Sequence, residues 1–226
     1  MKSRLNTGAA LLAAVASLFL APAALAQSAG QWTVKAGLGH IMPKVKSGDV
    51  TAPALPGTKA DVSADTQPVF AISYSFTDNI SAELDLGLPF EHELSGAGAI
   101  QGTGVLGTVK ALPPTVFLQY RFFSPSAKLR PMVGVGATFA YFADATGSGQ
   151  LTAISDIGGP PTTFKIKNKL AGTLQVGLIY NINARWFADL CVSKSFLKTR
   201  VSFSSGQTQD MKLDPLAAFV TLGYKF

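Results

Sequence analysis

The chain has 226 residues, a formal net charge of +6 and a single cysteine, Cys191. One cysteine excludes an intramolecular disulfide. Beyond residue 26, no apolar run approaches the ~20 residues of a membrane-spanning helix, and no apolar stripe with a helical period persists. Strands are therefore the expected elements.

The first 26 residues have the parts of a secretory signal peptide. Lys2 and Arg4 precede an apolar run over residues 9–20, and Ala24 and Ala26 form a small-residue cleavage site. The apolar run is too short for an anchoring helix, which needs ~20 residues. We expect cleavage to leave residues 27–226 with a net charge of +4, because Lys2 and Arg4 are removed. No cysteine lies near the cleavage site to carry a lipid.

Eight segments of alternating polarity follow the predicted signal peptide. Each has apolar side chains at every second position, and clusters of Gly, Pro, Asn, Asp and Ser separate them. The expected strands cover residues 31–43, 67–76, 80–92, 109–123, 129–142, 170–181, 186–198 and 213–226. The last strand ends with Tyr224 and Phe226 on its apolar face.

The face opposite the apolar one carries many polar side chains. They are Lys35, Glu83, Asp85, Gln119, Arg121, Arg130, Gln175, Asp189 and Lys225. In a soluble barrel, such as a lipocalin-like one, the apolar face points inward and the polar face meets water. So many charges in a dry core would carry a heavy desolvation cost. We therefore favour a barrel whose apolar face contacts lipid, and keep the soluble barrel as the alternative.

The connections between these strands alternate in length. Three are short (77–79, 124–128 and 182–185), and four are long (44–66, 93–108, 143–169 and 199–210). This alternation predicts an all-β fold, an eight-stranded antiparallel up-and-down transmembrane β-barrel with short periplasmic turns and long outer loops. The last strand would pair with the first, which leaves no free edge. Phe226 would then lie in the inner aromatic belt.

An ordered series of short motifs covers most of the predicted barrel. The series comprises TDNI at 77–80, EL at 83–84, LPF at 88–90, LPPT at 112–115, QYRF at 119–122, RP at 130–131 with glycines at 134 and 136, WF at 186–187 and GYKF at 223–226. In these motifs the chain resembles the OmpW family of eight-stranded outer-membrane barrels, which includes AlkL-type alkane-uptake proteins. The resemblance implies a narrow channel for small hydrophobic molecules. It also implies an assembly signal, Tyr224 and Phe226, recognised by the barrel-assembly machinery.

The lumen is expected to change character along its length. Its periplasmic half would hold a charged base made of Lys35, Glu83, Asp85, Arg121, Arg130, Asp189 and Lys225. The upper lumen would be an apolar funnel that includes Ile41, Phe117, Phe142 and Leu197. Eight strands enclose little more than their own side chains, so we expect no continuous water pore. Most of the charges are expected simply to pair within the filled base.

Three prolines fall inside the third and fourth predicted strands. Proline lacks an N–H and is expected only at sheet edges or bulges. The predicted register places Pro89 opposite Pro113, both facing inward, with Pro114 next to them. Together with the resemblance, this favours a lateral opening between the two strands. The alternative is a pair of bulges that merely bend the barrel.

Basic residues near the predicted outer rim include Lys165, Lys167 and Lys169. We expect this collar to bind lipopolysaccharide phosphates, since phosphate oxygens form charge-assisted hydrogen bonds with ammonium groups. A surface that faces the cell exterior is a poor candidate for binding nucleic acid.

The pattern does not favour an enzyme. His40 and His92 share the parity of the lipid-facing side chains, and neither lies in a nucleophile motif. Cys191 is interpreted as a small side chain packed in the lumen. The sequence has no metal-ligand cluster and no nucleotide-binding motif, so we expect no cofactor.

Two functions therefore compete: passive uptake of small hydrophobic molecules, and a non-transporting structural or adhesive barrel whose loops bind partners or phage. A weak point in the wall would favour uptake.

Overall fold

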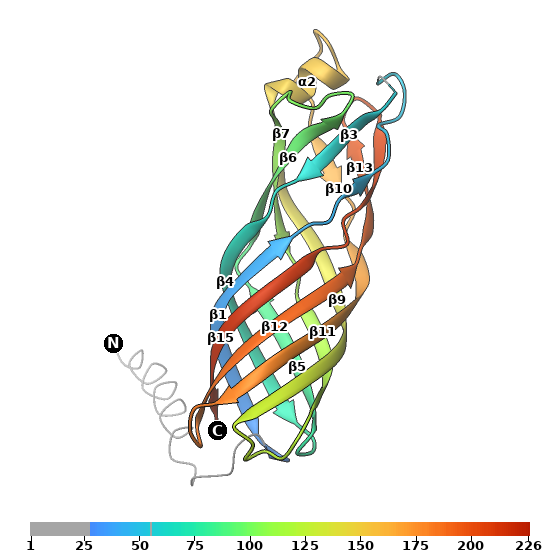
Figure 1. The fold of residues 1–226 in the computed structure, drawn as a ribbon. Coiled ribbons are helices and arrows are strands. Elements are labelled where there is room, and N and C mark those ends of the chain that lie inside the picture. The colour runs from blue at the N-terminus through green and yellow to red at the C-terminus, as the bar shows by residue number, and fades with distance from the viewer. Residues whose placement is uncertain (1–27, 55) are drawn as a thin grey trace, which may run out of the picture.

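The computed structural model describes residues 28–54 and 56–226, so the predicted signal peptide lies outside the described residues. Eight antiparallel strands close into a barrel, in which each strand pairs with the next and β11 pairs with β9 (Figure 1). In ring order they are β1 (Trp32–Met42), β4 (Asp65–Ser75), β5 (Ile80–Gly87), β8 (Thr115–Arg121), β9 (Leu129–Gly147), β11 (Lys169–Asn181), β12 (Trp186–Phe196) and β15 (Leu216–Lys225). The predicted fold class is confirmed.

The last strand closes the barrel against the first. The register of β1 with β15 runs from Thr33 opposite Lys225 to Met42 opposite Leu216. The amide of Phe226 extends this ladder by donating to the carbonyl of Trp32 at 3.0 Å. The C-terminal strand is thus paired to its end, as the closure argument predicts.

The wall of the barrel is apolar outside and polar inside. Exposed apolar side chains occur on every strand of the ring, among them Leu38, Phe70, Leu86, Leu118, Val135, Leu174, Leu190 and Val220. The intervening residues, such as Thr33, Lys35 and Gln119, are buried. Aromatic pairs gather at the short-turn end, including Trp32 with Tyr74 (ring centroids 4.9 Å apart), Tyr120 with Phe122 (5.0 Å) and Trp186 with Tyr224 (5.0 Å). This is the polarity of a barrel that faces lipid, with an interfacial belt at one end.

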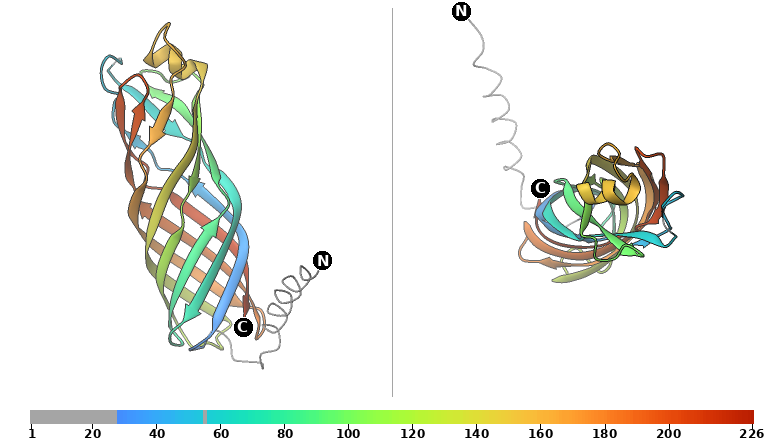
Figure 2. Two further views of the ribbon diagram at one scale, coloured as in Figure 1. Left: turned by 180° about the vertical axis from the view of Figure 1, so that it is seen from behind. Right: turned by 90° about the horizontal axis from the view of Figure 1, so that it is seen from above.

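The connections predicted as long loops instead contain strands, which form an extension above the barrel. In one sheet the upper part of β9 pairs with β7 (Val105–Leu112), which pairs with β6 (Phe90–Gly98), which pairs with β3 (Thr58–Val62). The neighbouring strands of the other sheet are, in order, β10 (Phe164–Ile166), β13 (Lys198–Phe203), β14 (Thr208–Lys212) and β2 (Lys46–Ser47). This extension and the short helix α2 (Gly149–Ser155) lie over the end of the barrel (Figure 2). Buried Leu106, Leu151, Phe164 and Val201 form its core. Of the described helices, none has the length and apolar character that crossing a membrane would require.

The third and fourth predicted strands are each interrupted at their prolines. One ends at Gly87 and resumes at Phe90, and the other ends at Leu112 and resumes at Thr115. The first interruption changes which residues point inward: Glu83 is buried below it, whereas Phe90 and His92 are buried above it. The expected lipid-facing parity of His92 is therefore wrong, because the unpaired residues between β5 and β6 reset the alternation.

Candidate functional site

A layer of polar side chains closes the lower lumen. The ammonium of Lys35 on β1 lies 2.9 Å from Glu83 Oε1 on β5 and 2.6 Å from Asp189 Oδ2 on β12. The side-chain amide of Gln119 donates to Glu83 at 2.7 Å and also to Gln175 at 3.0 Å. Gln175 in turn donates to the sulfur of Cys191 at 3.3 Å. These contacts run around the lumen through five strands, so the base is filled by bonded groups.

The remaining cations of the predicted base lie below this layer, toward the short turns. Arg121 donates to the hydroxyls of Ser73 and Ser75 at 3.1 and 3.2 Å. Arg130 donates to backbone carbonyls, including that of Asp78 at 2.6 Å. Lys225 donates to Asn181 Oδ1 at 2.7 Å. The expected pairing of charges is therefore found at Lys35. The contacts given above for the other three cations are with neutral oxygen atoms.

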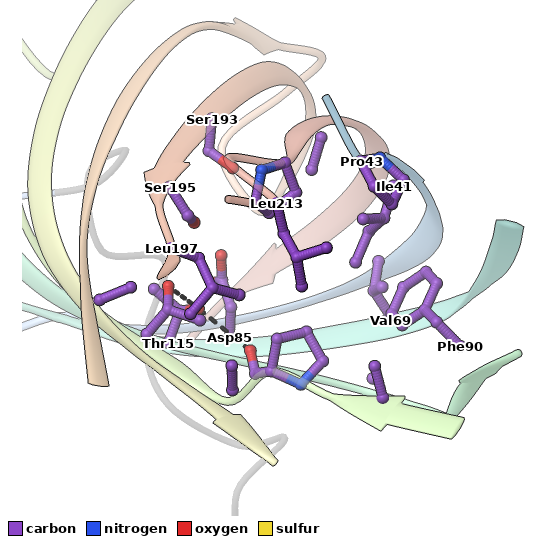
Figure 3. A pocket seen from close by; sticks show the side chains of 18 of the residues that line it. Ile41, Pro43, Val69, Asp85, Phe90, Thr115, Ser193, Ser195, Leu197 and Leu213 are labelled. Carbon is purple, nitrogen blue, oxygen red and sulfur yellow. Dashed lines mark hydrogen bonds between the residues drawn. The ribbon is translucent and has the colours of Figure 1, made fainter. Parts of the chain in front are cut away.

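A largely apolar cavity of about 120 Å³ lies above the polar layer. All four predicted upper-lumen residues, Ile41, Phe117, Phe142 and Leu197, line it, and Lys35, Asp85 and Cys191 belong to its lining where it meets the base. In Figure 3, Ile41, Val69 and Phe90 gather on one side of the cavity, and Leu197 and Leu213 project into it. The cavity is thus formed jointly by the barrel and the extension.

A row of hydroxyl groups crosses four neighbouring strands at the cavity wall. Thr115 and Thr138 are joined by a 2.8 Å hydrogen bond, Thr138 and Thr173 by one of 2.6 Å, and Thr173 and Ser195 by one of 2.9 Å. Thr115 also donates to the carbonyl of Pro113 at 3.0 Å, drawn as a dashed line in Figure 3. This row is not predicted from the sequence above, although inward Thr and Ser on adjacent strands could have indicated it. Since its hydroxyls bond one another, the row leaves the cavity mainly apolar.

One section of the cavity wall lacks a strand ladder. The β5–β8 pairing stops at Asp85 opposite Thr115, and the β6–β7 pairing starts at Phe90 opposite Ala111. We call the unpaired section between them, residues 86–89 and 112–114, the wall gap. Each side stays attached to its other neighbour: Leu88 donates to the carbonyl of Pro68 at 3.0 Å, and Phe139 donates to that of Pro114 at 2.9 Å. The interruption therefore lies specifically between these two segments.

The prolines of the wall gap are not arranged as the sequence predicts. Pro113 lines the cavity, but Pro89 is exposed and is not part of the lining. Extending the Phe90–Ala111 register by one residue places Pro89 opposite Leu112, and not opposite Pro113. The prediction that both prolines face inward is wrong, because the strand changes phase at Leu88 and Pro89.

Comparison with known proteins assigns the whole described barrel to one protein family. Residues 28–226 match the model of the OmpW family. The chain belongs to this family. It is 31% identical to outer membrane protein W of Vibrio cholerae, over 95% of this chain and 97% of that protein. Outer membrane protein AlkL of Ectopseudomonas oleovorans is 28% identical over 87% of this chain and 83% of its own length.

Structural comparison agrees with this family. The crystal structure of the outer membrane protein OprG from Pseudomonas aeruginosa has a TM-score of 0.79 and 26% identity, and the match covers 89% of this chain and 98% of OprG. This OmpW-family chain is thus an outer-membrane β-barrel and not an enzyme.

The two histidines of this OmpW-family barrel have different surroundings. His92 is buried at the upper end of the cavity, with Nδ1 2.8 Å from the carbonyl oxygen of Ser63. Burial lowers the pKa of His92, although the Ser63 carbonyl and Asp65 act in the opposite direction. His40 keeps its outward parity and lies 2.7 Å from the hydroxyl of Thr66. The first contact is with a backbone carbonyl, and the second is with an exposed threonine hydroxyl.

The predicted surface features of this OmpW-family barrel lie at its two ends. Tyr224 and Phe226 are part of the lower aromatic belt, with ring centroids 5.2 Å apart; their role as an assembly signal stays a prediction. Lys167 and Lys169 line a shallow hollow at the upper rim, but Lys165 is not part of its lining.

Proposed function

We propose that this OmpW-family barrel admits small hydrophobic molecules passively into its cavity and releases them sideways into the outer membrane through the wall gap. The single observation that carries the proposal is an apolar cavity bounded below by a closed polar layer and beside it by wall without a ladder. No energy source is needed, since the solute moves down its own gradient.

The size and lining of the cavity favour one small apolar molecule at a time. Its volume of about 120 Å³ is comparable with the ~150 Å³ of an engineered apolar cavity that stays dry and binds benzene. Side chains such as Phe117, Phe90 and Leu213 provide the apolar contacts. A short alkane or a single aromatic ring fits this description.

The polar layer disfavours passage straight through the base. A hydrophobic solute would have to displace the bonds between Lys35, Glu83 and Asp189, and it offers no groups to replace them. Separating buried charges from their partners costs several kcal/mol, on the order of 3–5 for a removed partner. A solute in the cavity therefore has its lower route blocked by electrostatics as well as by volume.

The wall gap offers a sideways route of lower cost. Opening a paired wall breaks ladder hydrogen bonds, and in lipid each unsatisfied backbone group costs several kcal/mol, because water is absent. Pro89, Pro113 and Pro114 have no N–H to leave unsatisfied, and the gap contains no ladder between its two sides. Exposed Leu86 and Leu88 give the lipid-facing side of the gap an apolar surface.

The test is uptake by cells that have an intact lipopolysaccharide leaflet and no other copy of the gene. n-Hexane and benzene serve as probes, because a short alkane and a single aromatic ring match the volume of the cavity. Wild-type protein should accelerate uptake over cells without it, and Pro89→Ala/Pro113→Ala, which lets the ladder extend, should slow uptake. Pro131→Ala is the matched control, because Pro131 lies opposite Leu178 within the paired β9–β11 ladder. Folding of every variant is checked by heat-modifiable mobility on a gel.

Two outcomes would contradict different parts of the proposal. A folded double variant that transports at the wild-type rate would refute the sideways route alone. Wild-type protein that adds nothing to uptake would refute transport and favour the structural or adhesive barrel.

A further inference from the structure

A hollow at the outer rim gathers positive charge from three separate parts of the chain. We call it the basic hollow; the charged residues that line it are Lys46, Lys167, Lys169, Lys198, Arg200, Lys212 and Asp210. Lys46 belongs to β2, Lys167 lies between β10 and β11, Lys169 begins β11, and the others belong to β13 and β14. Six cations therefore surround a single carboxylate.

The strand register places three of these lysines in one row. Lys198 on β13 lies opposite Lys212 on β14, and Lys212 lies opposite Lys46 on β2. Like charges directly opposite one another destabilise a sheet. The next pair on the same face of these strands is Arg200 opposite Asp210, joined by bonds of 2.6 and 2.9 Å. The charges of Arg200 and Asp210 thus offset each other across the two strands, whereas Lys198 and Lys212 present like charges to each other.

Most of the positive charge in the hollow has no counter-charge within the protein. Lys212 reaches Asp214 at 3.0 Å, and Arg200 binds Asp210. Among residues 28–54 and 56–226, Lys46, Lys167, Lys169 and Lys198 form no salt bridge. A bound anion would offset their mutual repulsion.

The height of the hollow identifies the kind of anion. Phe196, 55% exposed, stands two residues before Lys198, and Leu170, 72% exposed, directly follows Lys169. The apolar band of the barrel therefore ends where the lysines begin, and this is the level of lipid head groups. A ligand with phosphate above and acyl chains below would contact both surfaces at once.

We infer that the basic hollow binds a phosphate of lipopolysaccharide, with the acyl chains of that lipid lying against Leu170 and Phe196. Several ammonium groups around one phosphate make charge-assisted hydrogen bonds. Free phosphate shares the head-group chemistry but would gain nothing from the apolar surface below. The inference does not depend on transport, because the hollow faces outward from the rim.

The structure supplies both a test variant and a charge-matched control. Lys46→Gln/Lys167→Gln/Lys198→Gln removes three cations that have no ionic partner. The control, Lys59→Gln/Lys110→Gln/Lys165→Gln, removes the same charge from lysines that do not line the hollow. Thermal unfolding of the purified folded barrel in neutral detergent is measured with lipopolysaccharide, with dephosphorylated lipopolysaccharide and with inorganic phosphate.

The stability of the hollow variant relative to wild type should change in opposite directions without and with lipopolysaccharide. Without lipid, the hollow variant should be at least as stable as wild type, because repulsion between like charges is relieved. With lipopolysaccharide, it should lose the rise in Tm seen for wild type and bind about tenfold more weakly or worse, since each lysine near an anionic lipid surface contributes to binding. The control should keep the wild-type rise.

Three results would overturn the inference. The first is an undiminished rise in Tm for the hollow variant, and the second is equal protection by dephosphorylated lipopolysaccharide. The third is an equal rise with inorganic phosphate alone, which would assign the hollow to a free anion and not to the lipid.

Discussion

Removing Lys35 is expected to destabilise the barrel severely. Its ammonium lies within 3 Å of both Glu83 and Asp189, and all three side chains are buried. Lys35→Met would leave two buried carboxylates without their cation. Removal of one partner from a buried ion pair costs about 3–5 kcal/mol, so we expect a loss of that size in the free energy of unfolding.

The matched comparison is Lys225→Met. Lys225 is also buried in the lower lumen, but its bonding partner is the neutral side chain of Asn181. Losing a hydrogen bond to a neutral group costs about 1–3 kcal/mol when the partner stays buried. The Lys35 variant should therefore lose clearly more than the Lys225 variant.

The assay is urea unfolding in lipid vesicles, followed by the fluorescence of Trp32 and Trp186. A second variant, Lys35→Met/Glu83→Gln/Asp189→Leu, removes all three charges and should recover much of the lost stability, since replacing a buried ion pair by neutral groups is often tolerated. If Lys35→Met costs less than about 1 kcal/mol, the polar layer does not depend on this cation, and our account of the base is wrong.

Three further outcomes are expected. Because the pKa of His92 is lowered by burial, its contribution to stability should be complete above the ordinary pKa of ~6.5 and should decline as pH falls below it; His92→Gln should flatten pH-dependent unfolding in that range. Gly223→Ala should cost about 1–3 kcal/mol by overpacking, since its Cβ would lie 2.1 Å from the ring of Phe187, whereas Gly172→Ala meets nothing within 4 Å and should be near neutral in chemical unfolding. Deleting Phe226 should reduce the heat-modifiable barrel recovered from outer membranes, and unchanged recovery would argue against an assembly role.

The lower barrel could be predicted because its strands are continuous. With a side-chain period of two, one correctly phased residue fixes the direction of all others on the same strand. Lys35, Glu83 and Asp189 were placed inside by this argument, and each is buried. Their placement depends on the alternation within each strand and not on which strands are neighbours.

The upper part could not be predicted in the same way, because phase is lost at each interruption. Leu88 and Pro89 are both exposed, so the alternation restarts at Phe90 with the opposite parity. The extension adds pairings between distant segments, such as Lys46 with Lys212. Their strands are short, and a two-residue strand such as β2 carries no periodic signal. The sequence therefore predicts that basic residues gather at the outer rim, but which of them share the basic hollow emerges only from the three-dimensional arrangement.

The positions of the polar layer and the wall gap make a closed base compatible with the proposed passive transport. Asp85 is the last β5 residue paired with β8, and it also lines the cavity where it meets the polar layer. The ladder is therefore lost immediately above the level at which the lumen becomes impassable to an apolar solute. A gap lower in the wall would expose the buried charges of Glu83 and Lys35 to lipid at a high desolvation cost. A gap higher in the wall would open above the apolar band and release the solute into water. Under the proposed sideways route, the observed height of the gap is the one at which a hydrophobic molecule would exchange an apolar cavity directly for hydrocarbon.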